Sequence, residues 1–252
     1  MAENIRLSAA IVTYNCGDKA AAATASVLAR CREYPLDFYI IDNNSSDDTL
    51  LRLKGYGELK VLKLSKNIGF GAAHNAVLDM LRSDYHFVVN PDITVNSDVF
   101  ADMVRFMEAN PDVVMATPKI LSVDKTEQRL PKSRPTFKRL FLGRLSKKVR
   151  DEYIWTSREI TSPCPIDFCT GCFFCIRTSA FVSLGGFDDR YFMYLEDADL
   201  TIRAKSLGKV VFLPDVEVTH IWTRASAKSI KLFFIHLISC FKFLLKWRHL
   251  KQ

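Results

Sequence analysis

Four short apolar segments in the first half of the chain, each followed by a polar cluster, restrict what this sequence can fold into. Stretches of helical composition separate them, as in 19–31 and in the helically spaced apolar positions from Phe70 to Leu81. Alternating helices and continuous apolar strands are typical of a mainly parallel sheet with helices on both faces. We therefore expect an α/β, Rossmann-like fold. The four segments are 7–15, 37–49, 59–67 and 85–92.

The carboxyl ends of parallel strands meet at one edge of a sheet, and ligands gather there. The polar clusters fall at these ends, so we expect them to form one site. In chain order they are Thr13-Tyr14-Asn15, Asp42-Asn43-Asn44-Ser45, Asn67 with the glycine loop Gly69-Phe70-Gly71, and Asn90-Pro91-Asp92.

The last cluster indicates a metal site. Pro91 lacks an amide hydrogen, so the strand stops there and Asp92 is left at its end. A lone Asp in this position often caps the next segment. Among four polar clusters, however, its carboxylate suits Mg²⁺ or Mn²⁺ shared with a bound diphosphate.

The remaining chain is less regular. Ser97 is a candidate cap for a helix over 98–110, whereas 122–165 shows no clear periodicity and is either a functional loop or a helix that the pattern does not reveal. We expect a buried strand over 166–178 and final strands over 209–220. They leave His220 at a strand end, where it is either a buried structural histidine or a second ligand for metal or diphosphate.

The segment "YFMYLEDADL" (191–200) places Glu196, Asp197 and Asp199 at the start of a helix, directly after aromatic residues and Met193. Carboxylates stabilise a helix N-terminus by about 0.3 to 1 kcal/mol, which is one sufficient explanation. Apolar surroundings also raise the proton affinity of a carboxylate, which favours a general base.

Several classes of protein fit poorly. The glycine loop lacks the third small residue and the acidic residue of a dinucleotide fingerprint. The cysteines at 169, 172 and 175 lack a second pair at metal-site spacing, so we interpret them as buried thiols. A basic segment, 125–150, carries ten Lys and Arg but no interleaved aromatic motif, so we expect phosphate partners and not nucleic acid.

The N-terminus and the cysteines indicate the cellular location of the protein. Residues 1–15 show no basic region followed by an apolar core and a cleavage site, and the seven scattered cysteines fit reduced thiols. We therefore expect a cytoplasmic protein, and the C-terminal helix described below leads us to expect that it associates peripherally with the inner face of the cell membrane.

In combination, "AAIVTYN", "IIDNNSSDDT", "NIGFGAAHN", "VVNPD", "GGFDDRYFMYLEDADLTIR" and "VTH" resemble the family 2 inverting glycosyltransferases of the GT-A fold. The resemblance runs in order from about 7 to 222 and is nearest to bacterial rhamnosyltransferases of O-antigen or capsular polysaccharide assembly. It implies Asp197 as catalytic base beside Glu196, and Asp92 with His220 at the metal. Asn90 replaces the first carboxylate of the family's Asp-X-Asp motif, so the metal would rest chiefly on Asp92. The implied nucleotide-sugar-binding residues are Thr13, Tyr14, Asn15, Asp42, Asn44, Asn67, Gly69, Phe70, Gly71, Asn75 and Asn90.

The resemblance implies transfer of L-rhamnose from dTDP-β-L-rhamnose, assisted by a divalent cation, to a saccharide acceptor carried on a lipid diphosphate. An enzyme of the same fold that uses a UDP-hexose or UDP-N-acetylhexosamine is the alternative within this class. A catalytically inactive, membrane-associated module that only binds nucleotide sugars is the alternative outside it.

We divide the chain into a catalytic domain, 1–224, and a basic C-terminal segment, 225–252. Its longest uncharged stretch, 232–241, is too short to span a bilayer. As a helix it would carry one polar stripe, formed by Lys231, Ser239, Lys242, Lys246 and His249. We expect this amphipathic helix to lie on a membrane surface, or else to dock on its own domain or on a second copy in a homodimer.

Overall fold

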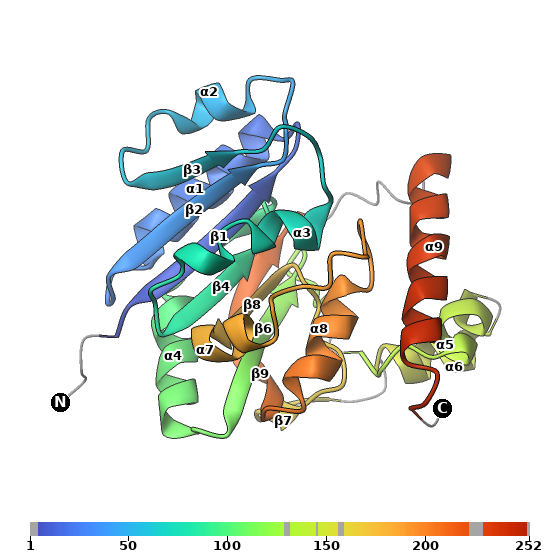
Figure 1. The fold of residues 1–252 in the computed structure, drawn as a ribbon. Helices are drawn as coiled ribbons and strands as arrows, with labels where there is room; N and C mark the ends of the chain where they lie inside the picture. The colour runs from blue at the N-terminus through green and yellow to red at the C-terminus, as the bar shows by residue number, and fades with distance from the viewer. Residues whose placement is uncertain (1–4, 129–131, 145, 156–158, 222–228, 251–252) are drawn as a thin grey trace.

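The computed structural model describes residues 5–128, 132–144, 146–155, 159–221 and 229–250. Its N-terminal half has the expected parallel strands, with β1 between β2 and β4, and β3 beside β2 (Figure 1). Side chains of β1 alternate between two cores, with Leu7, Ala9 and Ile11 in one and Ala10 and Val12 in the other. The bounds are β1 Leu7–Thr13, β2 Leu36–Asp42, β3 Leu59–Lys63 and β4 Tyr85–Val89.

Antiparallel strands enter the sheet in the second half of the chain. Strand β8 lies between β4 and β6 and is antiparallel to both, whereas β9 runs parallel to β6. The order among the described residues is β3-β2-β1-β4-β8-β6-β9-β5, with β7 also on β9. The sheet is thus mainly parallel, as expected. The bounds are β5 Ile93–Thr94, β6 Val113–Leu121, β7 Cys164–Pro165, β8 Phe173–Arg177 and β9 Lys209–His220.

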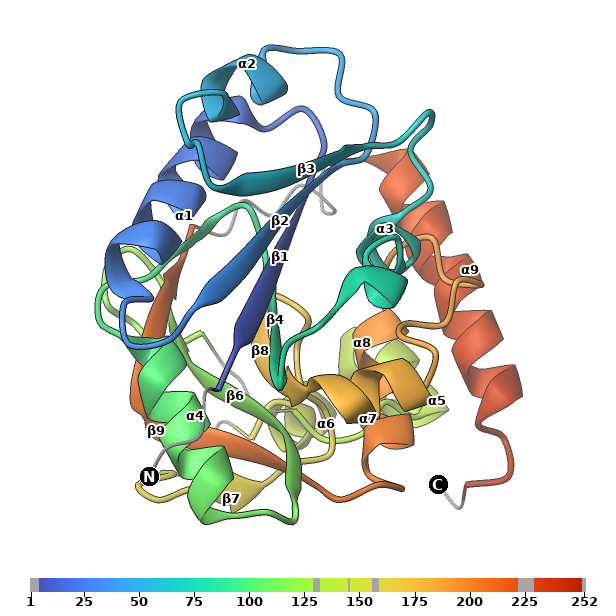
Figure 2. The same cartoon turned by 60° about the vertical axis from the view of Figure 1, so that its left-hand side comes forward.

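Helices cover both faces of the sheet, as the sequence predicts (Figure 2). Helices α1 and α4 contribute Val27 and Phe100 to one core, and α3, α7 and α8 contribute Ala73, Phe181 and Leu200 to the other. The bounds are α1 Gly17–Arg30, α2 Thr49–Leu53, α3 Phe70–Asn75, η1 Leu78–Met80, α4 Val99–Ala109, α7 Thr178–Ser183 and α8 Glu196–Ala204.

Three local predictions were wrong. The buried strand expected over 166–178 is confined to β8, Phe173–Arg177. The helix expected over 70–81 ends at Asn75, whose side-chain amide binds the backbone of Phe187, and only a 3-10 turn follows. The cap of α4 is Asp98 and not Ser97, because Asp98 Oδ1 accepts the Ala101 amide at 3.0 Å. Asp, Ser and Asn cap about equally well, so adjacent candidates cannot be separated from sequence.

The basic segment contains short helices that its pattern does not reveal. Thr136 and Ser146 accept backbone amides and cap α5 and α6, respectively. These helices are too short to show a periodic apolar face. The bounds are α5 Phe137–Phe141, η2 Leu142–Arg144 and α6 Lys147–Tyr153.

The predicted C-terminal helix forms as α9, Ile230–Lys246. Its Cys240 and Phe243 pack into a third apolar cluster with Leu195 and Ala198 of the loop and helix α8 beside them. The helix therefore docks on its own domain, which was one of the alternatives. The boundary proposed at 224/225 lies outside the described residues. Within the described part of the chain, no helix has the length and apolar character needed to cross a bilayer.

All seven cysteines are free thiols. Burial raises the pKa of Cys31 to about 12, and it raises the pKa of Cys169 and Cys175 well above the usual thiol range. This agrees with the interpretation of buried, unreactive thiols.

Candidate active site

The carboxyl ends of β1 and β2 lie side by side. Thr13 Oγ1 donates to Asp42 Oδ1 at 3.2 Å, and both side chains are buried. The Ser45 amide also donates to the Asp42 carboxylate. Next to this buried pair, the Tyr14 ring is 51 % exposed and so presents a flat apolar surface at the strand ends.

Two asparagines shape the loops above these strands by adopting left-handed backbone conformations, Asn15 with φ 49° and Asn44 with φ 67°. Asn15 Oδ1 accepts the Ser46 amide at 2.8 Å, which joins the β1 and β2 loops. Asn44 is exposed at the same edge. The side chains expected from β1 and β2 are thus gathered in one place.

A residue not included among the predicted ligands, Asn43, holds the glycine loop. Its Nδ2 donates to Asn67 Oδ1 at 3.1 Å and to the Gly69 carbonyl at 3.0 Å, and its Oδ1 accepts the Ile68 amide at 2.9 Å. Asn43 stands in one of the polar clusters, but sequence alone cannot distinguish an asparagine that binds ligand from one that binds a neighbouring loop.

The glycine loop is also joined to the aromatic loop 191–195. The Phe70 amide donates to the Phe192 carbonyl at 2.9 Å. Gly69 has φ +95°, and a Cβ there would lie 2.2 Å from the same Phe192 oxygen. Glycine is therefore required for this close approach.

Two other predicted ligands, Gly71 and Asn75, contact Phe187, which precedes the aromatic loop in sequence. Asn75 donates to the Phe187 carbonyl and accepts its amide, both at 2.8 Å. A Cβ on Gly71 would lie 2.7 Å from Phe187 Cβ, so Gly71 permits close packing. The geometry at both residues is explained by contact with Phe187.

Asp92 and His220, 128 residues apart, meet at the strand ends, with 3.1 Å between Asp92 Oδ1 and His220 Nε2. Gln128 orients the imidazole. Its Nε2 donates to the His220 carbonyl at 2.9 Å, so its Oε1 faces Nδ1 at 3.0 Å, which assigns the hydrogen to Nδ1. Lys19 Nζ lies 3.9 Å from Asp92 Oδ2.

This arrangement can hold a cation with help from a ligand. In a neutral ring, Nε2 and the Asp92 oxygen are both electron-pair donors aimed at each other, as in a shared metal site. Asn90 Oδ1 is buried without a hydrogen-bond partner among the described residues. Among the described residues, no group of three or more His, Cys, Asp or Glu side chains could hold a metal ion.

Asp197 opens α8 after a strained turn. Tyr194 and Leu195 have φ of 73° and 68°, a conformation that costs about 1 to 3 kcal/mol per non-glycine residue. The turn directs the Asp197 carboxylate at two backbone amides, those of Gly171 and Ala198, each at 2.9 Å. Part of the Asp197 side chain remains exposed.

The dipeptide Gly171-Cys172 connects this carboxylate to the Asn90-Pro91-Asp92 cluster. Gly171 donates its amide to Asp197, and the Cys172 carbonyl accepts the Asn90 amide at 2.8 Å. Burial raises the pKa of the Cys172 thiol to about 12, and the charges of Asp92 and Asp197 both add to this effect.

The adjacent carboxylates have different environments. Burial and the Asp197 charge raise the pKa of Glu196 well above its usual range, and Glu196 Oε2 has no partner among the described residues. Burial also raises the pKa of Asp197, while the Gly171 amide and the Lys132 ammonium oppose that rise. Lys132, which the sequence did not single out, lies over the Phe168 ring at 5.2 Å.

Comparisons with known proteins found similar sequences and structures. The model of the family described as "Glycosyl transferase family 2" matches residues 8–185. The N-acetylglucosaminyl-diphospho-decaprenol L-rhamnosyltransferase of Mycobacterium tuberculosis (strain CDC 1551 / Oshkosh) is 28 % identical over 227 residues, which cover 83 % of this chain and 74 % of that protein. The rhamnosyltransferase WbbL of Escherichia coli (strain K12) is 27 % identical over 199 residues, with 73 % of each chain covered.

Among solved structures, GalNAc-T7 crystallised with UDP, GalNAc and Mn²⁺ superposes with a TM-score of 0.68 and 19 % identity. The match covers 88 % of this chain but only 45 % of that one, so the chain spans less than half the length of that neighbour. At this identity the likeness shows a shared GT-A fold.

Proposed function

The chain belongs to glycosyl transferase family 2, and from this premise we propose that it is an inverting enzyme that transfers L-rhamnose from dTDP-β-L-rhamnose. The acceptor in this proposal is a saccharide carried on a lipid diphosphate, and the product enters a bacterial surface polysaccharide. That the chain is a glycosyltransferase of polysaccharide synthesis follows from the family and its relatives.

The observation that carries the proposal is the connection made by Gly171-Cys172. One residue binds the Asp197 carboxylate and the next binds Asn90 of the strand-end cluster. The proposed base and the proposed diphosphate-binding edge are thus linked through two adjacent residues. In-line displacement needs this arrangement, because the base must act on one face of the sugar while the diphosphate leaves from the other.

In the proposed reaction, Asp197 takes the proton of an acceptor hydroxyl. The hydroxyl oxygen forms a bond to the anomeric carbon as the bond from that carbon to the diphosphate oxygen breaks, and configuration inverts. The departing dTDP carries away the bonding electron pair, and the proton stays on Asp197. Burial raises the pKa of Asp197 and so strengthens it as a base.

Asp92, His220 and Asn90 would hold a divalent cation, which would neutralise the charge that develops on the leaving diphosphate. Lys19, beside Asp92, is placed to add positive charge at the same position. Exposed Tyr14 is placed to stack on the base of the nucleotide, next to the buried Asp42.

The choice of sugar rests on the relatives, two of which are named as rhamnosyltransferases and match most of this chain. The name of one of them includes an N-acetylglucosaminyl-diphospho-decaprenol, which supports an acceptor carried on a polyprenyl diphosphate.

Isothermal titration of the purified protein with dTDP-rhamnose, UDP-glucose, UDP-galactose and UDP-N-acetylglucosamine, each with Mg²⁺, tests the donor. We expect selective binding of dTDP-rhamnose that weakens in Asp92→Ala. The matched control is Asp79→Ala, which removes an exposed carboxylate in η1.

Preference for a uridine donor would mean that the enzyme transfers a different sugar by the same mechanism. Donor binding without hydrolysis or transfer would instead favour the inactive binding module. Equal affinity in wild type and Asp92→Ala would refute the assignment of Asp92 to the diphosphate site.

A further inference from the structure

Helix α9 leaves one complete apolar face uncovered by the described residues. Six side chains on this face are 44 % to 79 % exposed. At 3.6 residues per turn they fall within a stripe about 140° wide. A continuous exposed apolar patch of this kind usually marks an interaction surface. The six are Ile230, Phe233, Phe234, Ile238, Phe241 and Leu245.

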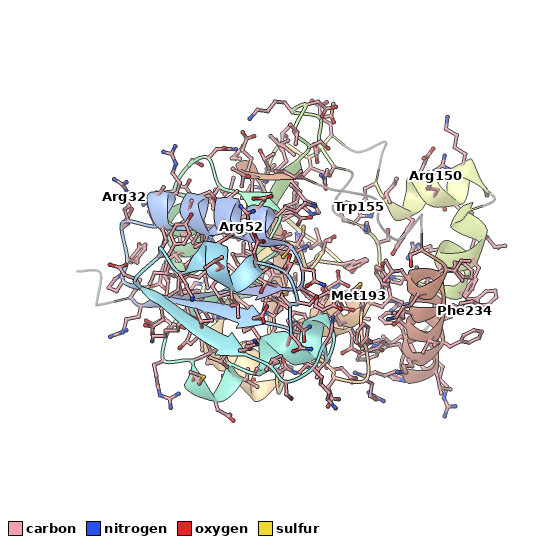
Figure 3. The ribbon with its side chains drawn as sticks, turned by 90° about the horizontal axis from the view of Figure 1, so that it is seen from above. Arg32, Arg52, Arg150, Trp155, Met193 and Phe234 are labelled. Carbon is pink, nitrogen blue, oxygen red and sulfur yellow. The ribbon has the colours of Figure 1, made fainter. Side chains whose placement is uncertain are left out.

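The opposite face of α9 holds the helix on the domain. Ser239 Oγ donates to the Met193 carbonyl at 2.7 Å, and Lys246 Nζ lies 2.7 Å from Asp188 Oδ2. Cys240 and Phe243 are buried beside them. Much of the polar stripe that the sequence predicts therefore turns toward the protein, and the apolar residues turn outward, as Phe234 does in Figure 3.

A basic surface adjoins this face. Residues 229–250 contain no Asp or Glu. Next to α9 lie α5 and α6, whose Leu140, Phe141 and Tyr153 pack against the same apolar cluster (Figures 1 and 3). These helices expose positive charge at Lys138, Lys147 and Lys148. Exposed apolar side chains lie beside them, at Phe137 of α5 and Leu142 of η2.

We propose that the outer face of α9, with α5 and α6 beside it, docks on an anionic lipid bilayer. Apolar side chains at the centre and lysines around them match the acyl boundary and the phosphate headgroups of such a surface. A second copy of the chain is a poorer occupant, because a symmetric pair would bring two carboxylate-free basic helices together. The helix is already formed and held by the domain, so docking needs no folding step.

The inner face of α9 links this surface to the candidate base. Ser239 binds Met193, and His236 lies 5.2 Å from the Tyr194 ring, centroid to centroid. Met193 and Tyr194 are separated from Glu196 and Asp197 by Leu195 alone. This step rests on the proposed function: an acceptor carried by a lipid would meet Asp197 at the docked surface.

Sedimentation of the full chain with vesicles tests the docking without any measure of activity. The vesicles contain phosphatidylcholine, with or without phosphatidylglycerol. We expect binding to the anionic vesicles that weakens as NaCl is added, and a loss of at least about ten-fold in Phe234→Glu/Phe241→Glu. Lys147→Glu/Lys148→Glu should remove the preference for phosphatidylglycerol.

Leu51→Glu is the matched control, because Leu51 in α2 is 64 % exposed but lies on a different helix. Donor titration of each variant shows that its fold and nucleotide site are intact, and it separates failure of docking from failure of the proposed function. Two outcomes would overturn the proposal. One is a wild-type protein that does not bind anionic vesicles, and the other is a dimer that the Phe234→Glu/Phe241→Glu variant dissociates.

Discussion

Glu196 and Asp197 are adjacent in the chain, but their carboxyl groups have different surroundings. Asp197 accepts two backbone amides and keeps an exposed part, whereas Glu196 is buried with one oxygen unpartnered among the described residues. The pKa of Glu196 is raised further, because burial is reinforced by the Asp197 charge. This difference supports the proposal that Asp197 acts as the base.

Replacing the base should therefore abolish turnover and spare donor binding. In Asp197→Asn, the amide oxygen can still accept the Gly171 amide, but the side chain cannot take a proton. We expect kcat to fall by about 10² to 10⁴, measured as release of nucleotide diphosphate, with the donor Kd unchanged. Asp189→Asn, on the exposed part of the preceding loop, is the control. Wild-type turnover in Asp197→Asn would remove Asp197 from the mechanism.

The pH dependence should report the Lys132 charge. Burial raises the pKa of Asp197, so activity should fall with acidification at a pH above the ordinary aspartate value. The Lys132 ammonium opposes that rise. Lys132→Met should consequently move the acidic limb of the kcat profile to higher pH, because the proton is then bound more tightly. Lys138→Met, an exposed lysine in α5, should leave the limb in place.

At the scale of elements, the site depends on a junction between two loops that are distant in sequence. The glycine loop and the aromatic loop are joined by the hydrogen bond from the Phe70 amide to the Phe192 carbonyl. The Asn43 side chain, at the end of β2, also binds the glycine loop. Most of these contacts involve a backbone group, and one, between Asn43 and Asn67, joins two side chains. Small changes in either loop should therefore disturb both nucleotide binding and the base.

Gly69→Ala tests this junction. The added methyl would collide with the Phe192 carbonyl, and φ +95° disfavours alanine. We expect the free energy of unfolding, measured by urea denaturation, to fall by about 1 to 3 kcal/mol. We also expect weaker donor binding, measured by titration. Gly57→Ala is the control, since its Cβ would meet nothing within 4 Å. Equal affinity in both variants would mean that the junction does not shape the nucleotide site.

The strand ends could be predicted from sequence because an apolar run and the polar residues that follow it are local signals. The contacts between loops could not. An apolar run such as 173–177 reads the same whether it pairs parallel or antiparallel, so the insertion of β8 beside β4 stayed hidden. The roles of Gly171 and Cys172 depend on that insertion. Gln128 was missed because it comes from a segment without periodicity and meets His220 only in three dimensions.

At the scale of the whole molecule, α9 forms part of the catalytic domain's packing. Asp199, which is fully buried in α8, is bound by Arg203 of its own helix and by Lys246 and Trp247 at the end of α9. A single buried carboxylate thus joins α8, which carries the proposed base, to the C-terminal helix. The surface proposed to meet a membrane and the proposed catalytic residue consequently belong to one packed unit.

Lys246→Met should weaken this unit in a pH-dependent way. Although burial raises the pKa of Asp188, hydrogen bonds from Arg190 and Lys246 hold it below the usual range. A lowered carboxylate pKa contributes stability above the unfolded value of about 3.9 and loses it as pH falls toward the folded value. We expect the free energy of unfolding of the variant to be about 1 to 3 kcal/mol lower than that of the wild type at neutral pH. This difference should narrow below about pH 4.

Urea denaturation across this pH range measures the effect, and Lys231→Met is the control, because Lys231 is exposed at the other end of α9. A difference between wild type and Lys246→Met that stays constant down to the lowest pH would assign the effect to lost packing of the lysine stem. A difference that narrows would show that charge holds α9 on the domain. Acidification alone should then loosen α9, since its carboxylate partner Asp188 lies on the domain side.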